Sequence, residues 1–145
     1  MPHQSLVLLA HDHSRILESL RFALDDLSVE THSVHTCSEL ARVISHRNPR
    51  LVFTDTSLPD GTWADVIGIV EKRVPTNVVV VGAHDDIGLY LSVLDRGAFD
   101  FIIPPFEREA LNFVVKSAAS DALGRRTPPL ARRGVMQSHY LLASA

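Results

Sequence analysis

The chain has 145 residues, of which 46% are hydrophobic and 21% charged, and its formal net charge is −3. This is the composition of an ordinary globular domain, and it excludes a wholly disordered chain. No apolar run reaches the roughly 18 residues of a membrane span, and the N-terminal residues lack the pattern of a secretory signal, so we expect a cytoplasmic protein without membrane association. The single cysteine, Cys37, excludes an intramolecular disulfide and a thiolate zinc cluster.

The charge is unevenly distributed along the chain. Residues 121–145 carry a net charge of +3, which leaves −6 on residues 1–120. Direct nucleic-acid binding needs clustered Lys and Arg, so the acidic part of the chain is not expected to bind nucleic acid. We therefore divide the chain into a domain over residues 1–122 and a basic, proline-containing tail over residues 123–145, which is either flexible or a short docking helix.

Five apolar runs alternate with five segments of helical periodicity along residues 1–122. The runs predict strands at residues 6–10, 29–35, 51–55, 77–82 and 99–103. The periodic segments predict helices at residues 14–27, 38–46, 63–73, 86–96 and 107–122.

This alternation predicts an α/β fold, a doubly wound five-stranded parallel sheet with helices on both faces. Right-handed crossovers favour the strand order 2-1-3-4-5 of flavodoxin-like folds. The first and third strands are then neighbours at the switch point, where such sheets place their chemistry. We expect Asp12 and Asp55, which follow these strands, to lie close together.

Three stretches carry a resemblance to a known family: VLLAHDH after the first strand, DTSLPDG after the third and GAFDFIIPPF across the fifth. Over roughly residues 5–122 the chain resembles the receiver domain of bacterial two-component response regulators. The resemblance implies that Asp55 accepts a phosphoryl group from a histidine kinase or phosphotransfer protein. It also implies that Mg²⁺ is held by Asp12, Asp55 and the backbone carbonyl of Ser57, oxygen ligands that suit this ion.

The chain departs from the receiver pattern at three polar positions. His11 stands where the first residue of an acidic pair is expected, so it would either weaken magnesium binding or replace it. Because a lone histidine at a strand end is more often simply a surface residue, we favour that interpretation. Gly82 replaces a small hydroxyl residue that would hydrogen-bond a phosphoryl oxygen. Pro104 replaces a lysine, so a phosphoryl group on Asp55 would lack its cationic partner. These losses are typical of atypical, degenerate receivers.

The resemblance also implies an output surface on the fourth helix, fifth strand and fifth helix, which receivers use for homodimers and partners. Its candidate residues are Tyr90, Phe106 and Phe101, the last at the aromatic switch position and also consistent with permanent inward packing. For Phe106 we favour a place in the core. The bond preceding Pro105 is expected to be cis, as in many receivers.

We therefore predict a stand-alone atypical receiver in phosphorelay signal transduction that binds partner proteins and is not an enzyme. One alternative is a pseudo-receiver that works without phosphorylation. Another is a haloacid dehalogenase-like phosphotransfer enzyme, but Ser57 stands where that chemistry needs a second aspartate. A flavodoxin-type FMN carrier would need a Ser/Thr/Gly-rich phosphate loop after the first strand, which this chain does not have. A zinc site of residues 11–13 with Asp55 is a further alternative, but the eight histidines are scattered, so we favour solvated histidines.

Overall fold

The computed structural model describes residues 6–73 and 75–124. Their main feature is a five-stranded, all-parallel sheet in the order β2-β1-β3-β6-β7, the order predicted from the alternating pattern. Its strands are β1 (Leu6–Ala10), β2 (Glu30–Val34), β3 (Leu51–Asp55), β6 (Asn77–Val81) and β7 (Asp100–Ile102). The predicted doubly wound, flavodoxin-like fold is therefore confirmed.

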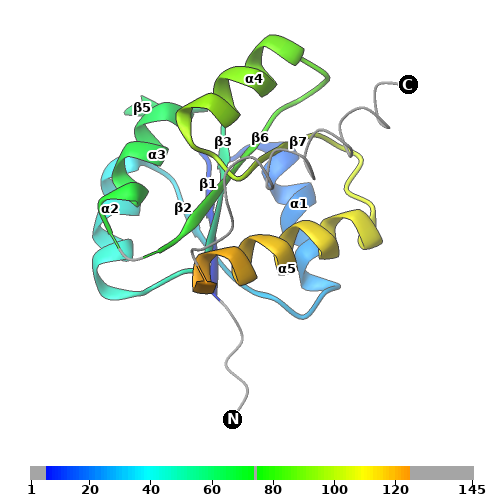
Figure 1. Cartoon of the computed structure of the whole chain (residues 1–145), viewed down its shortest axis with the longest axis horizontal. Coiled ribbons are helices and arrows are strands. Elements are labelled where there is room, and N and C mark those ends of the chain that lie inside the picture. Colours follow the sequence, from blue (N-terminus) through cyan, green and yellow to red (C-terminus); the bar gives the residue numbers. More distant parts are fainter. Residues whose placement is uncertain (1–5, 74, 125–145) are drawn as a thin grey trace.

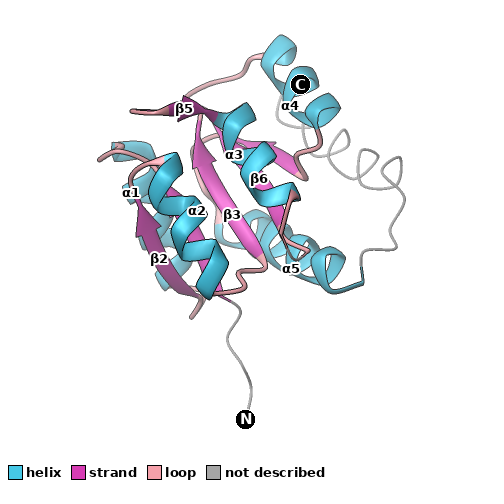
Figure 2. Ribbon diagram, turned by 90° about the vertical axis from the view of Figure 1, so that its left-hand side faces the viewer, coloured by secondary structure: helices cyan, strands magenta, loops and turns pink. Residues whose placement is uncertain are grey.

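Helices cover both faces of the sheet. Figure 1 shows α1 and α5 on one side, with α2 and α3 on the other, and Figure 2 shows α2 and α3 in front of the sheet. The helices are α1 (Arg15–Asp25), α2 (Cys37–His46), α3 (Trp63–Glu71), α4 (Ile87–Arg96) and α5 (Arg108–Gly124). No helix of the described part is long and apolar enough to cross a membrane.

Side-chain caps set the starts of several helices. Ser14, Thr36 and Asp86 each accept a hydrogen bond from a backbone N–H of the following helix, α1, α2 and α4 respectively. Such caps satisfy N–H groups that have no partner inside the helix. The starts of these helices consequently lie within a residue of where the sequence predicts them.

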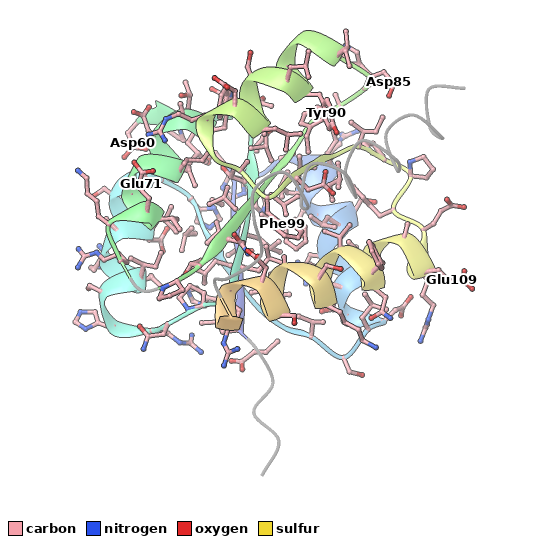
Figure 3. All side chains as sticks on the ribbon, viewed as in Figure 1. Asp60, Glu71, Asp85, Tyr90, Phe99 and Glu109 are labelled. Atoms are coloured by element: carbon pink, nitrogen blue, oxygen red, sulfur yellow. The ribbon has the colours of Figure 1, made fainter. Side chains whose placement is uncertain are left out.

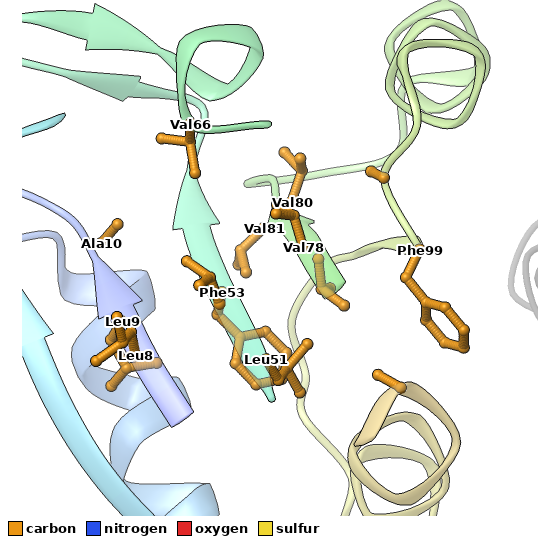
Figure 4. Packing of buried hydrophobic residues seen from close by; sticks show 14 of the residues in the cluster. Leu8, Leu9, Ala10, Leu51, Phe53, Val66, Val78, Val80, Val81 and Phe99 are labelled. Atoms are coloured by element: carbon orange, nitrogen blue, oxygen red, sulfur yellow. The ribbon is translucent and has the colours of Figure 1, made fainter. Parts of the chain in front are cut away.

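The core lies on both faces of the central strands, and Figure 4 shows part of it. Every residue of LVLLA after Leu6, the first four residues of β3, and all of β6 are buried. Strands covered on both faces need apolar side chains at successive positions, which explains why these runs do not alternate with polar residues. The rigid core fixes the carboxyl ends of β1, β3 and β6 side by side.

Three details differ from the sequence predictions. A two-stranded hairpin of β4 (Ser57–Leu58) and β5 (Gly61–Thr62) forms between β3 and α3, and no sequence pattern predicted strands so short. Helix α3 ends two residues earlier than predicted, at Glu71, and α5 runs on to Gly124. The rest of the predicted tail, residues 125–145, lies outside the described residues.

Candidate functional site

Asp55 ends β3 at the carboxyl edge of the sheet. Its neighbours are fixed by register, since Ala10 of β1 lies opposite Thr54 and Val81 of β6 lies opposite Asp55. Its carboxylate Oδ1 accepts a hydrogen bond of 2.7 Å from the N–H of Thr56, and the residue is half-buried. The side chain is thereby held at the edge while remaining accessible to solvent.

The other two residues predicted to bind magnesium come from loops at the same edge. Asp12 follows β1, the immediate neighbour of β3, and its side chain is 51% exposed. Ser57 follows Asp55 by two positions and begins the short hairpin of β4 and β5. The strand order thus places the loops that carry these oxygen donors at the same edge of the sheet, and their role in magnesium binding stays a prediction.

The hairpin that carries Ser57 is anchored to two helices. Asp60 accepts hydrogen bonds from the backbone N–H groups of Cys37 (2.7 Å) and Ser38 (3.0 Å), at the start of α2. These bonds, that of Cys37 foremost, lower the pKa of Asp60. At the other end, the N–H of Trp63 donates to the carbonyl of Thr56 at 3.1 Å. Asp60 is labelled at the left of Figure 3.

Our interpretation of His11 as a surface residue is wrong, because its side chain is fully buried. The ring is turned toward the start of α1, where its Nδ1 accepts a hydrogen bond of 3.0 Å from the N–H of Ser14. Burial lowers the pKa of His11, while the Glu18 carboxylate, 3.8 Å from Nε2, raises it by a smaller amount. His11 therefore holds the loop that leads into α1, by accepting from the N–H of its cap residue Ser14, and its ring does not replace the missing carboxylate.

Gly82 and Phe101 occupy one space. A Cβ atom added to Gly82 would lie 2.5 Å from Cζ and 2.8 Å from Cε1 of the Phe101 ring, far inside contact distance. The ring is buried, with 3% exposure, and packs edge-on against Tyr90 at a centroid distance of 6.4 Å. The aromatic ring therefore fills the volume that a side chain at position 82 would need.

Comparison with known proteins assigns the chain to a family. The family model described as response regulator receiver domain matches residues 7–116. The chain belongs to the response regulator receiver domain family. The receiver domain of NtrX from Brucella abortus has 29% sequence identity and a TM-score of 0.68, over 79% of this chain and 98% of that one. A CheY-like receiver domain protein from Methanospirillum hungatei, 19% identical with a TM-score of 0.70 over 85% and 99% of the two chains, shares the fold.

Curated relatives of this receiver domain are longer proteins. The response regulator PilR of Pseudomonas aeruginosa is 29% identical over 112 residues, which are 77% of this chain and 25% of PilR. The regulatory protein LuxO of Vibrio cholerae is 30% identical over 115 residues, 79% of this chain and 25% of LuxO. The chain thus spans about a quarter of the length of these relatives.

Receiver domains typically bind Mg²⁺ for phosphorylation, and the donors of this receiver fit that ion in kind. Two carboxylates, Asp12 and Asp55, and the carbonyl of Ser57 are hard oxygen ligands. The expected acidic pair has only one carboxylate because residue 11 is a histidine, whose ring is buried against the start of α1. Pro104, joined to Pro105 by a cis peptide as expected, brings no charge to the site.

The predicted output residues are mostly inside the receiver. Tyr90, labelled in Figure 3, belongs to the buried side of α4 and is 2% exposed. Phe101 is buried next to it, and Phe106 packs against the core. Among the side chains of α4 and α5 whose burial is described, the exposed large hydrophobic ones are instead Ile87, Leu91 and Phe113. Tyr90, Val93 and Leu94 have the spacing of one helix face, and all three are buried, so the sequence held a signal that Tyr90 points inward.

Restoring the acidic pair by His11→Asp is expected to strengthen Mg²⁺ binding by about tenfold or more, because it adds a second carboxylate directly beside Asp12 and anionic oxygen ligands suit this ion. Trp63 is the only tryptophan, and its backbone N–H donates to the carbonyl of Thr56, the residue after Asp55, so its fluorescence should report the titration. His46→Asp makes the same change at an exposed position of α2 and should leave the affinity unchanged. An unaltered affinity in a folded His11→Asp protein would count against Mg²⁺ at this edge.

Proposed function

We propose that this receiver is a signalling module that acts by binding partner proteins, with Asp55 as the phosphoacceptor. Receiver domains are generally signalling modules rather than enzymes, and they interact with histidine kinases or phosphotransfer proteins. In the proposed reaction a carboxylate oxygen of Asp55 attacks the phosphorus of the donor, and the bond to the donor's leaving group breaks. Asp12, Asp55 and the Ser57 carbonyl would hold the Mg²⁺ that offsets the phosphoryl charge.

In this proposal, phosphorylation of Asp55 changes the conformation of the receiver only weakly. The observation that supports this is the packing of Phe101 over Gly82. The glycine offers no hydroxyl for a phosphoryl oxygen, and the Phe101 ring already fills the adjoining volume. A modified Asp55 therefore has no side chain at position 82 through which to move the aromatic residue.

The phosphorylated form of Asp55 is also less stabilised here than in a receiver that has all of the expected polar residues around it. A phosphoryl group carries nearly two negative charges and is normally held by positive charge. Pro104 offers none, and the buried His11 ring is held by burial toward its neutral form. Low occupancy and a short lifetime of the phosphorylated state follow from this.

Packing of Phe101 equally favours a second reading, an interaction module that signals without phosphorylation. Because the Phe101 ring is already buried, the surface next to α4 keeps one conformation whether or not Asp55 is phosphorylated. We propose that this surface, with Ile87 and Leu91 on α4 and Phe113 on α5, contacts a partner protein or a second copy of the chain. All three side chains are more than half exposed, and exposed apolar groups are common at contact surfaces.

The experiment that separates the two readings is incubation of the purified chain with acetyl phosphate and Mg²⁺, followed by intact-mass measurement. Phosphorylation predicts one phosphoryl adduct, which Asp55→Asn abolishes. Asp85→Asn, an exposed carboxylate before α4 (Figure 3), should keep it. If neither an adduct nor beryllofluoride binding is found in folded protein, Asp55 is not an acceptor and the second reading stands.

A further inference from the structure

Three metal-ligating side chains meet where β1 and β2 end. Asp12 and His13 follow β1, and His35 follows β2, directly beyond the pairing of Ala10 with Val34. Each residue offers one ligand atom, and the three atoms all lie within 4.8 Å of one another. The two loops are brought together by strand order, although 22 positions separate the histidines in the sequence. This cluster is not the one predicted from the sequence, which grouped residues 11–13 with Asp55.

The His35 ring is oriented for metal binding by the backbone. Its Nδ1 lies 3.0 Å from the carbonyl oxygen of His11. A carbonyl only accepts hydrogen bonds, so Nδ1 must carry the hydrogen, and a neutral ring then presents the lone pair of Nε2. Metal-binding histidines almost always donate their other ring N–H to a carbonyl or carboxylate in this way. The loop itself is held by the His35 N–H, which donates to Glu39 Oε1 at 2.8 Å.

The backbone at His13 brings the second imidazole to the first. His13 has a φ of 56°, a left-handed conformation that is uncommon for residues other than glycine. In this conformation its ring stacks on that of His35 with 5.1 Å between centroids and 19° between planes. Its Nε2 also lies 3.8 Å from Oδ1 of Asp12. The side chains of His13 and Asp12 are 84% and 51% exposed, so an ion can reach them from solvent.

We propose that Asp12, His13 and His35 bind a transition-metal ion of the zinc class. Two imidazoles and a carboxylate are a common ligand set for Zn²⁺ and also suit Co²⁺ and Ni²⁺, whereas Mg²⁺ prefers oxygen ligands alone. Three protein ligands leave a further position for water. Asp12 also belongs to the proposed magnesium set, but His13 and His35 do not, so variants of these histidines test the zinc-class site independently of Asp55.

The test is calorimetric titration of the full chain with Zn²⁺ in millimolar Mg²⁺, after treatment with a chelator. We expect one Zn²⁺ per chain in the wild type. His13→Ala and His35→Ala should each weaken it by about 100-fold or more, since loss of even an outer hydrogen-bond partner of a ligand costs about 10- to 100-fold. His46→Ala removes an exposed histidine of α2 outside the cluster and should leave the affinity unchanged.

Titration with Co²⁺ gives a second readout, because a low-coordinate imidazole site produces visible absorption bands that both variants should lose. His13→Ala is the more informative variant, since its ring is exposed and His35 also bonds the backbone of His11. Equal Zn²⁺ affinity in wild type and His13→Ala, with unchanged thermal unfolding, would overturn the proposal and assign any bound ion to other histidines. Absence of Zn²⁺ binding in the wild type would overturn it directly.

Discussion

Replacing Gly82 by alanine is expected to destabilise the receiver by about 1–3 kcal/mol, the usual cost of forcing an extra methyl group into a packed core. The added Cβ would meet the Phe101 ring at 2.5 Å, and the ring is confined by Tyr90. Urea unfolding of the two proteins measures the difference. Phe101→Leu shortens the residue that causes the clash, so Gly82→Ala should cost less in that background. The coupling free energy should be about 0.5–3 kcal/mol.

Gly68→Ala is the matched control for this substitution. A Cβ at Gly68, inside α3, would lie 3.5 Å from Nη2 of Arg96, an ordinary contact. Alanine is the better helix former, so this change should be neutral or stabilising by about 0.5–1 kcal/mol. A Gly82→Ala protein as stable as the wild type would show that the Phe101 ring is free to move, and the proposal of weak readout would then lose its basis.

Restoring a hydroxyl at position 82 should therefore not restore switching by itself. Threonine is larger than alanine, and its side chain would compete with Phe101 for the same volume. The two positions have to change together, since the ring must leave before the hydroxyl can face Asp55. Gly82 and Phe101 are thus one structural unit, and the sequence alone shows only two separate departures.

The fold and the place of Asp55 could be predicted because both depend on periodic patterns. Continuous apolar runs identify strands buried on both faces, and crossover handedness then restricts the strand order. The residue that ends the third run has to stand at the carboxyl edge. The hairpin of β4 and β5 could not be predicted in this way, because two-residue strands have no periodicity. It depends on contacts between distant segments, such as those of Asp60 with α2.

Burial of His11 could not be read from its place at the end of a strand. The position of the ring depends on two contacts. Its Nδ1 accepts a hydrogen bond of 3.0 Å from the N–H of Ser14, and its Nε2 lies 3.8 Å from the carboxylate of Glu18. Both depend on how the loop after β1 turns into α1, which composition does not reveal. The pairing of His13 with His35 was more accessible, since the strand order 2-1 already places the ends of those two strands side by side.

Asp100 should make the receiver less stable as the pH rises from about 4 to about 7. Its carboxylate is 2% exposed, Oδ1 accepts a hydrogen bond of 2.7 Å from the N–H of Phe101, and Oδ2 has no hydrogen-bond partner among the described residues. Burial raises the pKa of Asp100 from the ordinary 3.8 to about 7. The folded state therefore holds a proton that the unfolded state has released in this interval, and stability falls as the proton is lost.

This group alone should cost the wild type about 3 kcal/mol between pH 5 and pH 8, at 1.36 kcal/mol per unit of pH below the folded pKa. Asp100→Asn cannot titrate and keeps an acceptor for the N–H of Phe101. Its free energy of unfolding relative to wild type should therefore improve by about that amount from pH 5 to pH 8. Comparing the variant with the wild type at each pH cancels the contribution of His11 to the pH dependence of stability. That contribution has the opposite sign, because burial lowers the pKa of His11. Asp95→Asn, an exposed carboxylate of α4, should show no such change. The same offset at both pH values would mean that Asp100 is ionised throughout, with its charge stabilised inside the fold.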